Sequence, residues 1–319
     1  MRAFIFPGQG SQAVGMGRAL ADASTTARDV FGEVDEALGQ GLLRLMSDGP
    51  ADELQLTENA QPAIMANALA TLRVLERDAG IRLADKVDYV AGHSLGEYSA
   101  LCAAQALELS TTARLLKLRG QAMQRAVAVG EGAMAAILGA DIERAGAIAR
   151  AGVDAVKQEG GPELVCAVAN DNDPGQVVIS GHRAAVERAV SLAKELGAKR
   201  AIILPVSASF HCSLMEPAAR EMEGALADAD LRGPLVPVYV NIDAAPVADP
   251  GLLRDALVRQ VTGLVRWRES VERMVEAGVT DFIEFGGKVL SPMVKRIAPD
   301  ANAVSVISMD DLDALAKAL

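Results

Sequence analysis

Short apolar runs and longer amphipathic stretches follow one another along most of the chain. Residues 3–6, 87–91 and 281–285 are short, mostly apolar runs with the β-branched and aromatic side chains typical of buried strands. The stretches between them are rich in alanine, leucine and charged residues, and residues 63–79 form the strongest helical pattern. Strands that alternate with helices predict a parallel sheet with helices on both faces.

Glycine and proline mark the limits of several predicted helices. Residues 19–56 predict helices that break at Gly39 and at Gly49-Pro50. Gln61-Pro62 opens the helix over residues 63–79, because the N–H that proline lacks would have no partner in a first helical turn. The further predicted elements of this kind are helices at 111–128, 252–261, 267–276 and 290–297 and strands at 236–241 and 303–308.

Residues 131–206 follow a different order of elements, in which a turn at residues 170–175 separates two adjacent strands. The order β-α-β-β-α-β is the ferredoxin-like pattern. We therefore expect an α/β fold in which a small ferredoxin-like domain, residues 131–206, is inserted into a catalytic domain of residues 1–130 and 207–319. The insert's predicted strands are 134–138, 164–169, 176–180 and 200–204, and its helices are 142–157 and 183–196.

The segment Gly92-His93-Ser94-Leu95-Gly96 lies between a predicted strand and a predicted helix. A G-x-S-x-G pattern in this setting is typical of a nucleophile elbow, where the serine stands on a sharp turn that the glycines make possible. The helix that starts there directs its N–H groups and the positive end of its dipole toward a developing oxyanion. The N–H of Leu95 is one natural donor.

A serine nucleophile needs a base, since its hydroxyl is almost fully protonated at neutral pH. Of the three histidines, His93 adjoins Ser94 on a turn where neighbouring side chains point apart, and His182 is predicted at an exposed helix start in the insert. His211 lies on a loop at residues 207–215, where the main domain resumes, and we expect it to be the base. No acid stands out to complete a triad, so we predict a Ser94–His211 dyad and leave the orienting group, carboxylate or carbonyl, open.

Composition narrows the classes of partner. The net charge of −11, from 31 basic and 42 acidic residues, argues against nucleic acid or an anionic membrane as the main partner. The three cysteines follow no C-x-x-C spacing, which indicates reduced thiols in a cytoplasmic protein. The chain begins with a strand rather than a signal peptide, and no apolar run approaches the ~18 residues of a membrane span.

Four short segments, taken together and in order, are highly specific. They are Phe6-Pro7-Gly8-Gln9-Gly10-Ser11-Gln12, Gly92-His93-Ser94-Leu95-Gly96-Glu97, Asn172-Asp173-Pro174-Gly175-Gln176-Val177-Val178-Ile179-Ser180-Gly181 and Phe210-His211-Cys212-Ser213-Leu214-Met215. Through them the chain resembles the malonyl-CoA:acyl carrier protein transacylases of fatty acid synthesis, and the similarity extends nearly end to end. The resemblance implies a hydrolase-like α/β core with a ferredoxin-like insert, in agreement with the pattern of predicted elements.

The resemblance also implies roles for residues around the predicted elbow. Ser94 is similar to the family's nucleophile and His211 to its base. Gln9 matches the glutamine whose backbone N–H joins that of Leu95 in the oxyanion hole. Arg119 matches the arginine that pairs with the free carboxylate of the malonyl group, and a guanidinium fits a carboxylate with two parallel hydrogen bonds.

Four further positions match residues around the family's site. Gln260 resembles the residue whose carbonyl orients the histidine, and Gln61 resembles a second glutamine that lines the site. Asn172 lies in a matching motif of the insert that faces the cleft. Phe210 resembles the bulky residue that restricts space near the acyl α-carbon in the malonyl-type members of the family.

The reaction implied by the resemblance transfers a malonyl group from malonyl-CoA to the phosphopantetheine thiol of acyl carrier protein through a malonyl-serine. It requires no metal and no redox cofactor, and we expect a monomer. Two alternatives share the dyad: an acyl thioesterase or hydrolase, against which Arg119 and the insert argue, and a malonyl transferase of a polyketide pathway. A binding module without activity is disfavoured, because Ser94 and His211 are both present.

Overall fold

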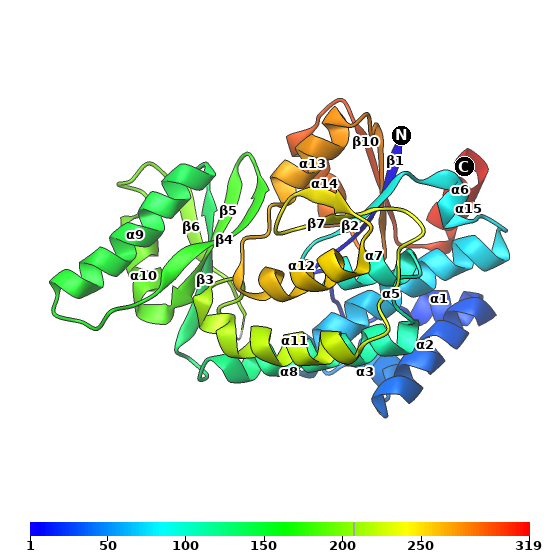
Figure 1. Cartoon of the computed structure of the whole chain (residues 1–319), viewed down its shortest axis with the longest axis horizontal. Helices are drawn as coiled ribbons and strands as arrows, with labels where there is room; N and C mark the ends of the chain where they lie inside the picture. The colour runs from blue at the N-terminus through cyan, green and yellow to red at the C-terminus, as the bar shows by residue number, and fades with distance from the viewer. Residues whose placement is uncertain (207) are drawn as a thin grey trace.

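A six-stranded sheet forms the centre of the larger part of the protein in the computed structural model, which describes residues 1–206 and 208–319 (Figure 1). Its strands lie in the order β10 (Asn302–Val306), β9 (Asp281–Phe285), β1 (Arg2–Phe6), β2 (Tyr89–Gly92), β7 (Val238–Val240) and β8 (Ala245–Val247). The first five are parallel, as predicted, and β8 is antiparallel to β7. Ser207, the first residue of the loop predicted at 207–215, lies outside the described residues.

Helices cover both faces of this sheet because successive side chains of β1 point to opposite faces and those of residues 3–6 are all apolar. Phe4 and Phe6 belong to a core that includes α5 (Thr57–Asp78) and α7 (Gly96–Ala103). Ala3 and Ile5 belong to a second core with α13 (Trp267–Glu276) and α14 (Leu290–Ile297). The side chains of residues 3–6 are fully buried.

The helix that contains Pro62 differs from its prediction. α5 begins at Thr57, so Pro62 lies in its second turn and not in the first. The side chains of Ala60 and Gln61 are buried, and this packing outweighs the backbone hydrogen bond that proline cannot make. None of the described helices is long and apolar enough to cross a membrane. The other helices of this part are α1 (Arg18–Ala23), α2 (Thr25–Leu38), α3 (Leu42–Asp48), α4 (Ala51–Gln55), α6 (Leu83–Lys86), α8 (Leu109–Ala126), the short η1 (Ser213–Met215), α11 (Glu216–Asp228), α12 (Pro250–Thr262) and α15 (Met309–Ala318).

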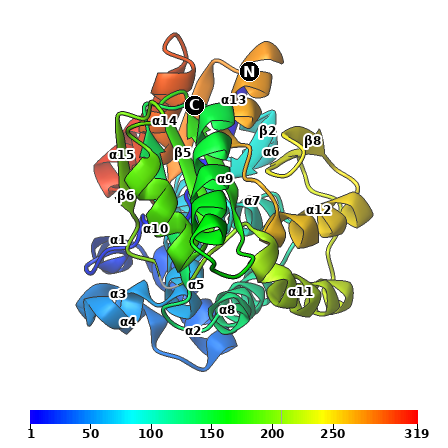
Figure 2. The same ribbon diagram turned by 90° about the vertical axis from the view of Figure 1, so that its left-hand side faces the viewer.

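The smaller part, at the left of Figure 1, contains an antiparallel sheet with the strand order β4 (Cys166–Asp173), β5 (Gln176–His182), β3 (Gly132–Leu138) and β6 (Arg200–Ile203). Two helices, α9 (Ile142–Gln158) and α10 (Arg183–Leu192), pack on one face, and they stand at the front of Figure 2. Ile137 and Ile148 are fully buried there. Met134 and Val178 instead join the core of the larger part. Residues 131–206 are called the insert from here on.

The turn predicted at residues 170–175 is wrong for its first four residues, which continue β4 as far as Asp173. Two ion pairs tie this end of β4 to helices of the larger part. Asp171 pairs with Arg268 of α13 at 2.8 Å, and Asp173 pairs with Arg296 of α14 at 2.7 Å. Such contacts hold a polar segment in the extended form that its local turn propensity opposes.

Candidate active site

Ser94 stands at the sharp turn between β2 and α7, with a positive φ of 54°. The two flanking glycines make this turn possible. A Cβ atom on Gly92 would lie 1.9 Å from the backbone of Gly96, and one on Gly96 would lie 2.2 Å from Phe6 O. Neither space admits a side chain, so the chain takes the strand–turn–helix geometry that the elbow motif predicts.

The Ser94 hydroxyl is within hydrogen-bond distance of His211, whose Nε2 lies 2.8 Å from Ser94 Oγ. On the other side of the ring, Nδ1 lies 2.9 Å from the backbone oxygen of Gln260. A carbonyl oxygen can only accept, so Nδ1 carries the hydrogen and Nε2 is left to accept the serine proton. The ring nitrogen on this side of His211 is thus bonded to a backbone carbonyl and not to a carboxylate.

Burial keeps this imidazole neutral. His211 is 4% exposed, and burial together with the nearby Arg119 guanidinium lowers the pKa of the imidazole to about 3. The hydrogen bond to the Gln260 carbonyl raises the pKa of His211, but by less. A general base must be unprotonated when it acts, and a neutral imidazole at physiological pH meets that requirement.

The other two histidines are bonded elsewhere. His93 Nε2 lies 2.8 Å from Asn172 Oδ1, so this ring links the elbow to the insert. His182 Nδ1 accepts the N–H of Val165 at 2.9 Å within the insert. His182 does lie at a helix start, but it is half-buried rather than exposed as predicted. Neither ring is hydrogen-bonded to the Ser94 hydroxyl in the described part of the chain.

Three neutral acceptors hold the guanidinium of Arg119 beside the serine. Nη2 donates to Ser94 Oγ at 3.1 Å and to Gln260 Oε1 at 2.9 Å, and Nη1 donates to Gln61 Oε1 at 2.9 Å. Arg119 is 1% exposed, and no carboxylate among the described residues forms an ion pair with it. Because burial of a cation without an anionic partner is costly, this arrangement favours an anionic ligand beside Ser94.

A pocket of about 410 Å³ opens over Ser94, with walls from both parts of the protein. Met134 and Val178 of the insert supply apolar lining. Gln260 is fully buried and does not reach the pocket surface. The structure brings the other predicted site residues together on its walls, namely Gln9, Gln61, Ser94, Leu95, Arg119, Asn172, Phe210 and His211.

Two backbone N–H groups on the pocket wall, those of Gln9 and Leu95, have no acceptor among residues 1–206 and 208–319. Gln9 follows β1 and Leu95 follows β2, and these neighbouring parallel strands bring both loops to one edge of the sheet. The N-terminus of α7 adds a favourable dipole at the same point. The two donors suit an oxyanion on an acyl group attached to Ser94.

Sequence reasoning missed Asn241, which holds the elbow, and Glu97, which bonds to Asn241. Asn241 Oδ1 accepts the N–H of Ser94 at 2.7 Å, and Asn241 Nδ2 donates to the carbonyl of Gly92 at 2.7 Å. Glu97 Oε2 in turn accepts the N–H of Asn241 at 2.9 Å. The sequence held a signal for each residue. Asn241 ends a predicted strand, at the edge of the sheet where parallel sheets place their binding sites. Glu97 is an acid within a predominantly apolar helix.

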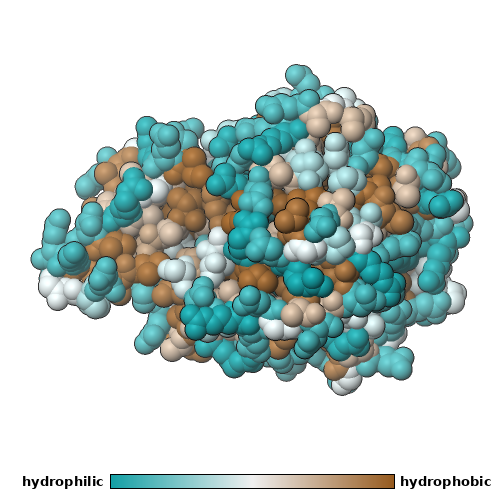
Figure 3. All heavy atoms as spheres, viewed as in Figure 1, coloured by the Kyte–Doolittle hydropathy of each residue, from teal (hydrophilic) through white to brown (hydrophobic). Residues whose placement is uncertain are grey.

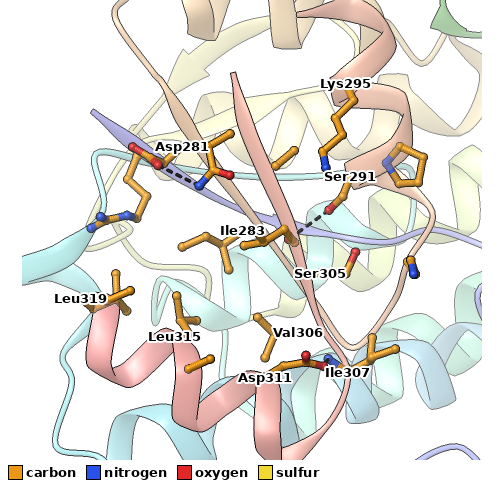
Figure 4. A pocket seen from close by; sticks show the side chains of 18 residues that line it. Asp281, Ile283, Ser291, Lys295, Ser305, Val306, Ile307, Asp311, Leu315 and Leu319 are labelled. Atoms are coloured by element: carbon orange, nitrogen blue, oxygen red, sulfur yellow. Dashed lines mark hydrogen bonds between the residues drawn. The ribbon is translucent and has the colours of Figure 1, made fainter. Parts of the chain in front are cut away.

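A second hollow, of about 680 Å³, lies along the outer edge of β10 between α14 and α15 (Figure 4). Several of its polar groups bond to one another or to the backbone. Ser291 Oγ donates to Val304 O at 3.0 Å, and Asn302 Nδ2 donates to Asp281 Oδ1 at 3.1 Å. None of the predicted site residues lines this hollow, which is called the β10 groove below.

The acyl transferase domain family matches residues 3–290 of the chain. Among curated proteins, the chain is similar to the malonyl CoA-acyl carrier protein transacylase of Bacillus subtilis (strain 168). The two are 43% identical over 312 residues, which cover 98% of this chain and 95% of that protein.

Solved structures of the same kind share the fold. The acyl-carrier-protein S-malonyltransferase from Bartonella henselae superposes with a TM-score of 0.94 at 48% identity, over 99% of this chain and 98% of that one. A malonyl-transacylase solved in complex with its type II PKS acyl-carrier protein gives a TM-score of 0.93 at 38% identity, over 100% and 99% of the two chains. The mixed α/β architecture, with one largely parallel and one antiparallel sheet, is common to these proteins.

Proposed function

Because the chain belongs to the malonyl CoA-acyl carrier protein transacylases of the acyl transferase family, we propose that it transfers a malonyl group from malonyl-CoA to the phosphopantetheine thiol of acyl carrier protein. The buried guanidinium of Arg119 carries this proposal. It bonds to Ser94 Oγ and has no carboxylate partner among the described residues. An acyl group with a free carboxylate supplies that anion while its thioester carbon faces the serine.

In the first half reaction, His211 Nε2 takes the proton of the Ser94 hydroxyl as Oγ attacks the thioester carbonyl carbon. The π electrons of the carbonyl move to its oxygen, and the N–H groups of Leu95 and Gln9 stabilise the oxyanion. The carbonyl then re-forms and the C–S bond breaks. Coenzyme A leaves as a thiol with the proton that His211 returns, and Ser94 carries a malonyl ester.

In the second half reaction, the acceptor thiol gives its proton to His211 and its sulfur attacks the ester carbon. The same oxyanion forms and collapses, the C–O bond breaks, and Ser94 recovers its proton from His211. The Gln260 carbonyl keeps the imidazole in the tautomer that both halves need. The steps are proton transfers and acyl substitutions, so they involve no change of oxidation state and need no cofactor.

We propose that residues around the Arg119 guanidinium select the acyl group. Arg119 pairs with the malonyl carboxylate, and Gln61 keeps it oriented through the 2.9 Å hydrogen bond to Nη1. Phe210 lines the pocket and limits the space near the acyl α-carbon. Asn172 lines the same pocket, which supports a role in substrate binding, and its side chain also bonds to His93.

For the domain organisation, we propose a hydrolase-like catalytic domain of residues 1–130 and 207–319 with a ferredoxin-like insert at residues 131–206. An elbow before a helix on a parallel sheet supports the first assignment. The βαββαβ order of the insert's antiparallel sheet supports the second. We also propose a monomer, and the unpaired cysteines suit a cytoplasmic protein.

A second candidate keeps the chemistry and changes the acceptor. One similar protein was solved with a type II PKS acyl-carrier protein, so a carrier protein of a polyketide pathway is the alternative acceptor. Parallel assays with carrier proteins from both kinds of pathway distinguish the two candidates. The acceptor with the higher kcat/KM identifies the pathway.

The intact mass of the protein after brief exposure to malonyl-CoA tests the proposed function. We expect one malonyl adduct, which peptide mapping after a quench should assign to the fragment that holds residues 92–97. Carrier protein should discharge the adduct far faster than water does, and the reverse would identify a hydrolase. An adduct on another fragment, or one that persists in Ser94→Ala, contradicts the mechanism.

A further inference from the structure

Glu97 is a fully buried acid that no step of the proposed reaction uses. It lies in the first turn of α7, three residues after Ser94. Its Oε2 accepts two hydrogen bonds at 2.9 Å, from the N–H of Asn241 and from Nε2 of Gln260. Its Oε1 has no partner among the described residues. A buried carboxylate with an unpaired oxygen costs stability, so packing alone does not account for an acid at this position.

The side chain of Gln260 connects this acid to the groups around the reacting serine. Gln260 Nε2 also donates to Ser94 O at 3.0 Å and lies 3.4 Å from Asn241 Oδ1. At the other end of the amide, Oε1 accepts from Arg119 Nη2 at 2.9 Å. One amide therefore bridges the Glu97 carboxylate and the Arg119 guanidinium.

When it is ionised, the Glu97 carboxylate is the one charged acceptor near Gln260 Nε2 in the described structure, because the other two are neutral oxygens. A hydrogen bond to a charged group contributes more than one between neutral groups. Inside the protein it also polarises the amide, which makes Gln260 Oε1 a better acceptor for the cation. The reversed amide would set its NH₂ group against the guanidinium and its oxygen against the carboxylate. Glu97 thus favours the orientation that presents an oxygen to Arg119.

The charges in this cluster also favour a protonated guanidinium on Arg119. Burial lowers the pKa of Arg119, and Tyr98 and Glu97 act against that effect, so the acid helps to keep the guanidinium protonated. Burial raises the pKa of Glu97 to about 7, although its hydrogen bonds and Arg119 oppose the rise. Asp243 is a further acid near the cluster, and it raises the pKa of Glu97. Asp243 is itself paired with Arg259 at 2.7 Å.

We propose that Glu97 is a positioning residue for acyl-group selection, which acts through the Gln260 amide to hold the Arg119 guanidinium where the carboxylate of an acyl donor binds. The inference rests on the proposed function, because it takes malonyl-CoA as the donor. The proposal predicts different effects on two kinds of reagent. Glu97 assists the reaction of Ser94 with donors that carry a carboxylate. It has almost no effect on the reaction of Ser94 with neutral reagents.

Two substitutions at this position separate loss of the acceptor from loss of the charge. Glu97→Met removes the acceptor at similar side-chain length, and Glu97→Gln returns a neutral amide oxygen. For each variant we compare malonylation of Ser94 by malonyl-CoA with modification of Ser94 by phenylmethanesulfonyl fluoride, a neutral reagent for activated serines. Glu97→Met should slow malonylation of Ser94 about tenfold or more. It should slow modification of Ser94 by the neutral reagent by less than about threefold. Glu97→Gln should restore malonylation to within about threefold of the unchanged protein.

Ser99→Ala is the matched control, because Ser99 is a fully buried polar residue of the same helix whose hydroxyl has no partner among the described residues. It should leave both rates unchanged. In an Arg119→Ala background, Glu97→Met should cause no further loss of malonylation, since its effect passes through Arg119. Equal losses of both rates in folded Glu97→Met, or a full further loss in the Arg119→Ala background, would overturn the inference.

Gln260→Met gives a second route if Glu97→Met does not fold. It removes the amide and keeps the backbone carbonyl that bonds to His211. The same selective loss of malonylation is expected, and an unchanged rate rejects the inference. Complete absence of malonyl-Ser94 in the unchanged protein would instead contradict the proposed function, whereas its presence without the selective pattern contradicts the role of Glu97 alone.

Discussion

The pocket over Ser94 is smaller than the β10 groove, about 410 Å³ against about 680 Å³, yet of these two hollows it is the pocket that brings buried groups of complementary chemistry to one side-chain atom. Ser94 Oγ has an imidazole at 2.8 Å and a guanidinium at 3.1 Å. In the groove, Asp281 accepts from Asn302, and Asp311 accepts from the N–H of Ile307. The difference teaches that convergent polar groups, and not volume, identify the candidate site in this protein.

The two hollows also differ in the solvent exposure of their charged side chains. Arg119 in the pocket is 1% exposed, whereas Lys295 in the groove is exposed and keeps its hydration. On the face drawn in Figure 3, hydrophilic side chains are spread among small hydrophobic patches, so an exposed charge is ordinary on this surface. A buried cation needs compensation from neighbours or a ligand, and an exposed one does not. Substitutions in the pocket should therefore have large effects, and substitutions in the groove should have small ones.

His211→Ala should give the largest effect in the pocket. Loss of a general base lowers a rate by about 10²–10⁴-fold, and we expect that loss for malonylation of Ser94. His182→Ala should leave the rate nearly unchanged, since the His182 ring bonds to Val165 within the insert. Mass spectrometry of quenched time points measures both variants. A near-normal rate in His211→Ala would make His93 the next candidate base.

Arg119→Ala should give the next largest effect, and a selective one. The charge-assisted hydrogen bonds that a malonyl carboxylate loses are worth roughly 1.5–3 kcal/mol. Malonyl transfer should therefore fall roughly ten- to a hundredfold. Acetyl transfer from acetyl-CoA should fall much less, because acetyl has no carboxylate to pair. Equal losses for both donors would show that Arg119 does not distinguish acyl groups.

Dependence on pH sharpens the comparison at Glu97, a buried acid in the helix that follows Ser94. Burial raises the pKa of Glu97 from 4.5 to about 7, so between these values the folded protein binds more protons than the unfolded chain. The contribution of Glu97 to the free energy of unfolding therefore falls as pH rises through that window. Glu97→Gln lacks the titration, and its stability relative to the unchanged protein should increase from about pH 4.5 to about pH 7, by roughly 3 kcal/mol at most. Urea unfolding across this range measures the difference, and a constant difference would contradict the raised pKa.

Gln260→Ala should have a smaller effect on the dyad itself. The substitution keeps the backbone carbonyl that bonds to His211 Nδ1 and removes the side-chain hydrogen bonds to Ser94 O, Glu97 and Arg119. Modification of Ser94 by phenylmethanesulfonyl fluoride should therefore slow by less than about tenfold. A much larger loss with the fold intact would assign the orienting role to the side chain.

The elements closest to the elbow could be predicted because their signals are local. The apolar run before Gly92, the two glycines and the helix-forming residues after Gly96 all lie within one short stretch. The contact of Ser94 with His211, across 117 positions, was predicted by elimination among three histidines, and the structure contains it. The catalytic roles of the two residues stay predictions.

Features that depend on contacts between distant segments could not be predicted in the same way. The extension of β4 to Asp173 requires arginines of α13 and α14, which lie about a hundred positions later in the chain. The network of Glu97, Asn241 and Gln260 joins three segments whose spacing carries no signature of its own. The resemblance implied that the Gln260 carbonyl orients the histidine, but the hydrogen bond between the Gln260 side chain and Arg119 depends on the folding of distant segments and has no signal in the sequence.

The smallest effects are expected from the β10 groove. Lys295 and Ile307 are both exposed there and labelled in Figure 4, and Ile307 is 58% exposed. Surface substitutions away from special contacts shift free energies by less than about 0.5 kcal/mol, so Lys295→Ala and Ile307→Ser should leave malonylation of Ser94 within about twofold of the unchanged rate. The assay uses malonyl-CoA without carrier protein, so it reports the first half reaction alone. Because β10 stays paired with β9 along its inner edge, neither change should shift the sheet that carries the elbow. A tenfold loss in either folded variant would break the comparison and make the groove part of the working enzyme.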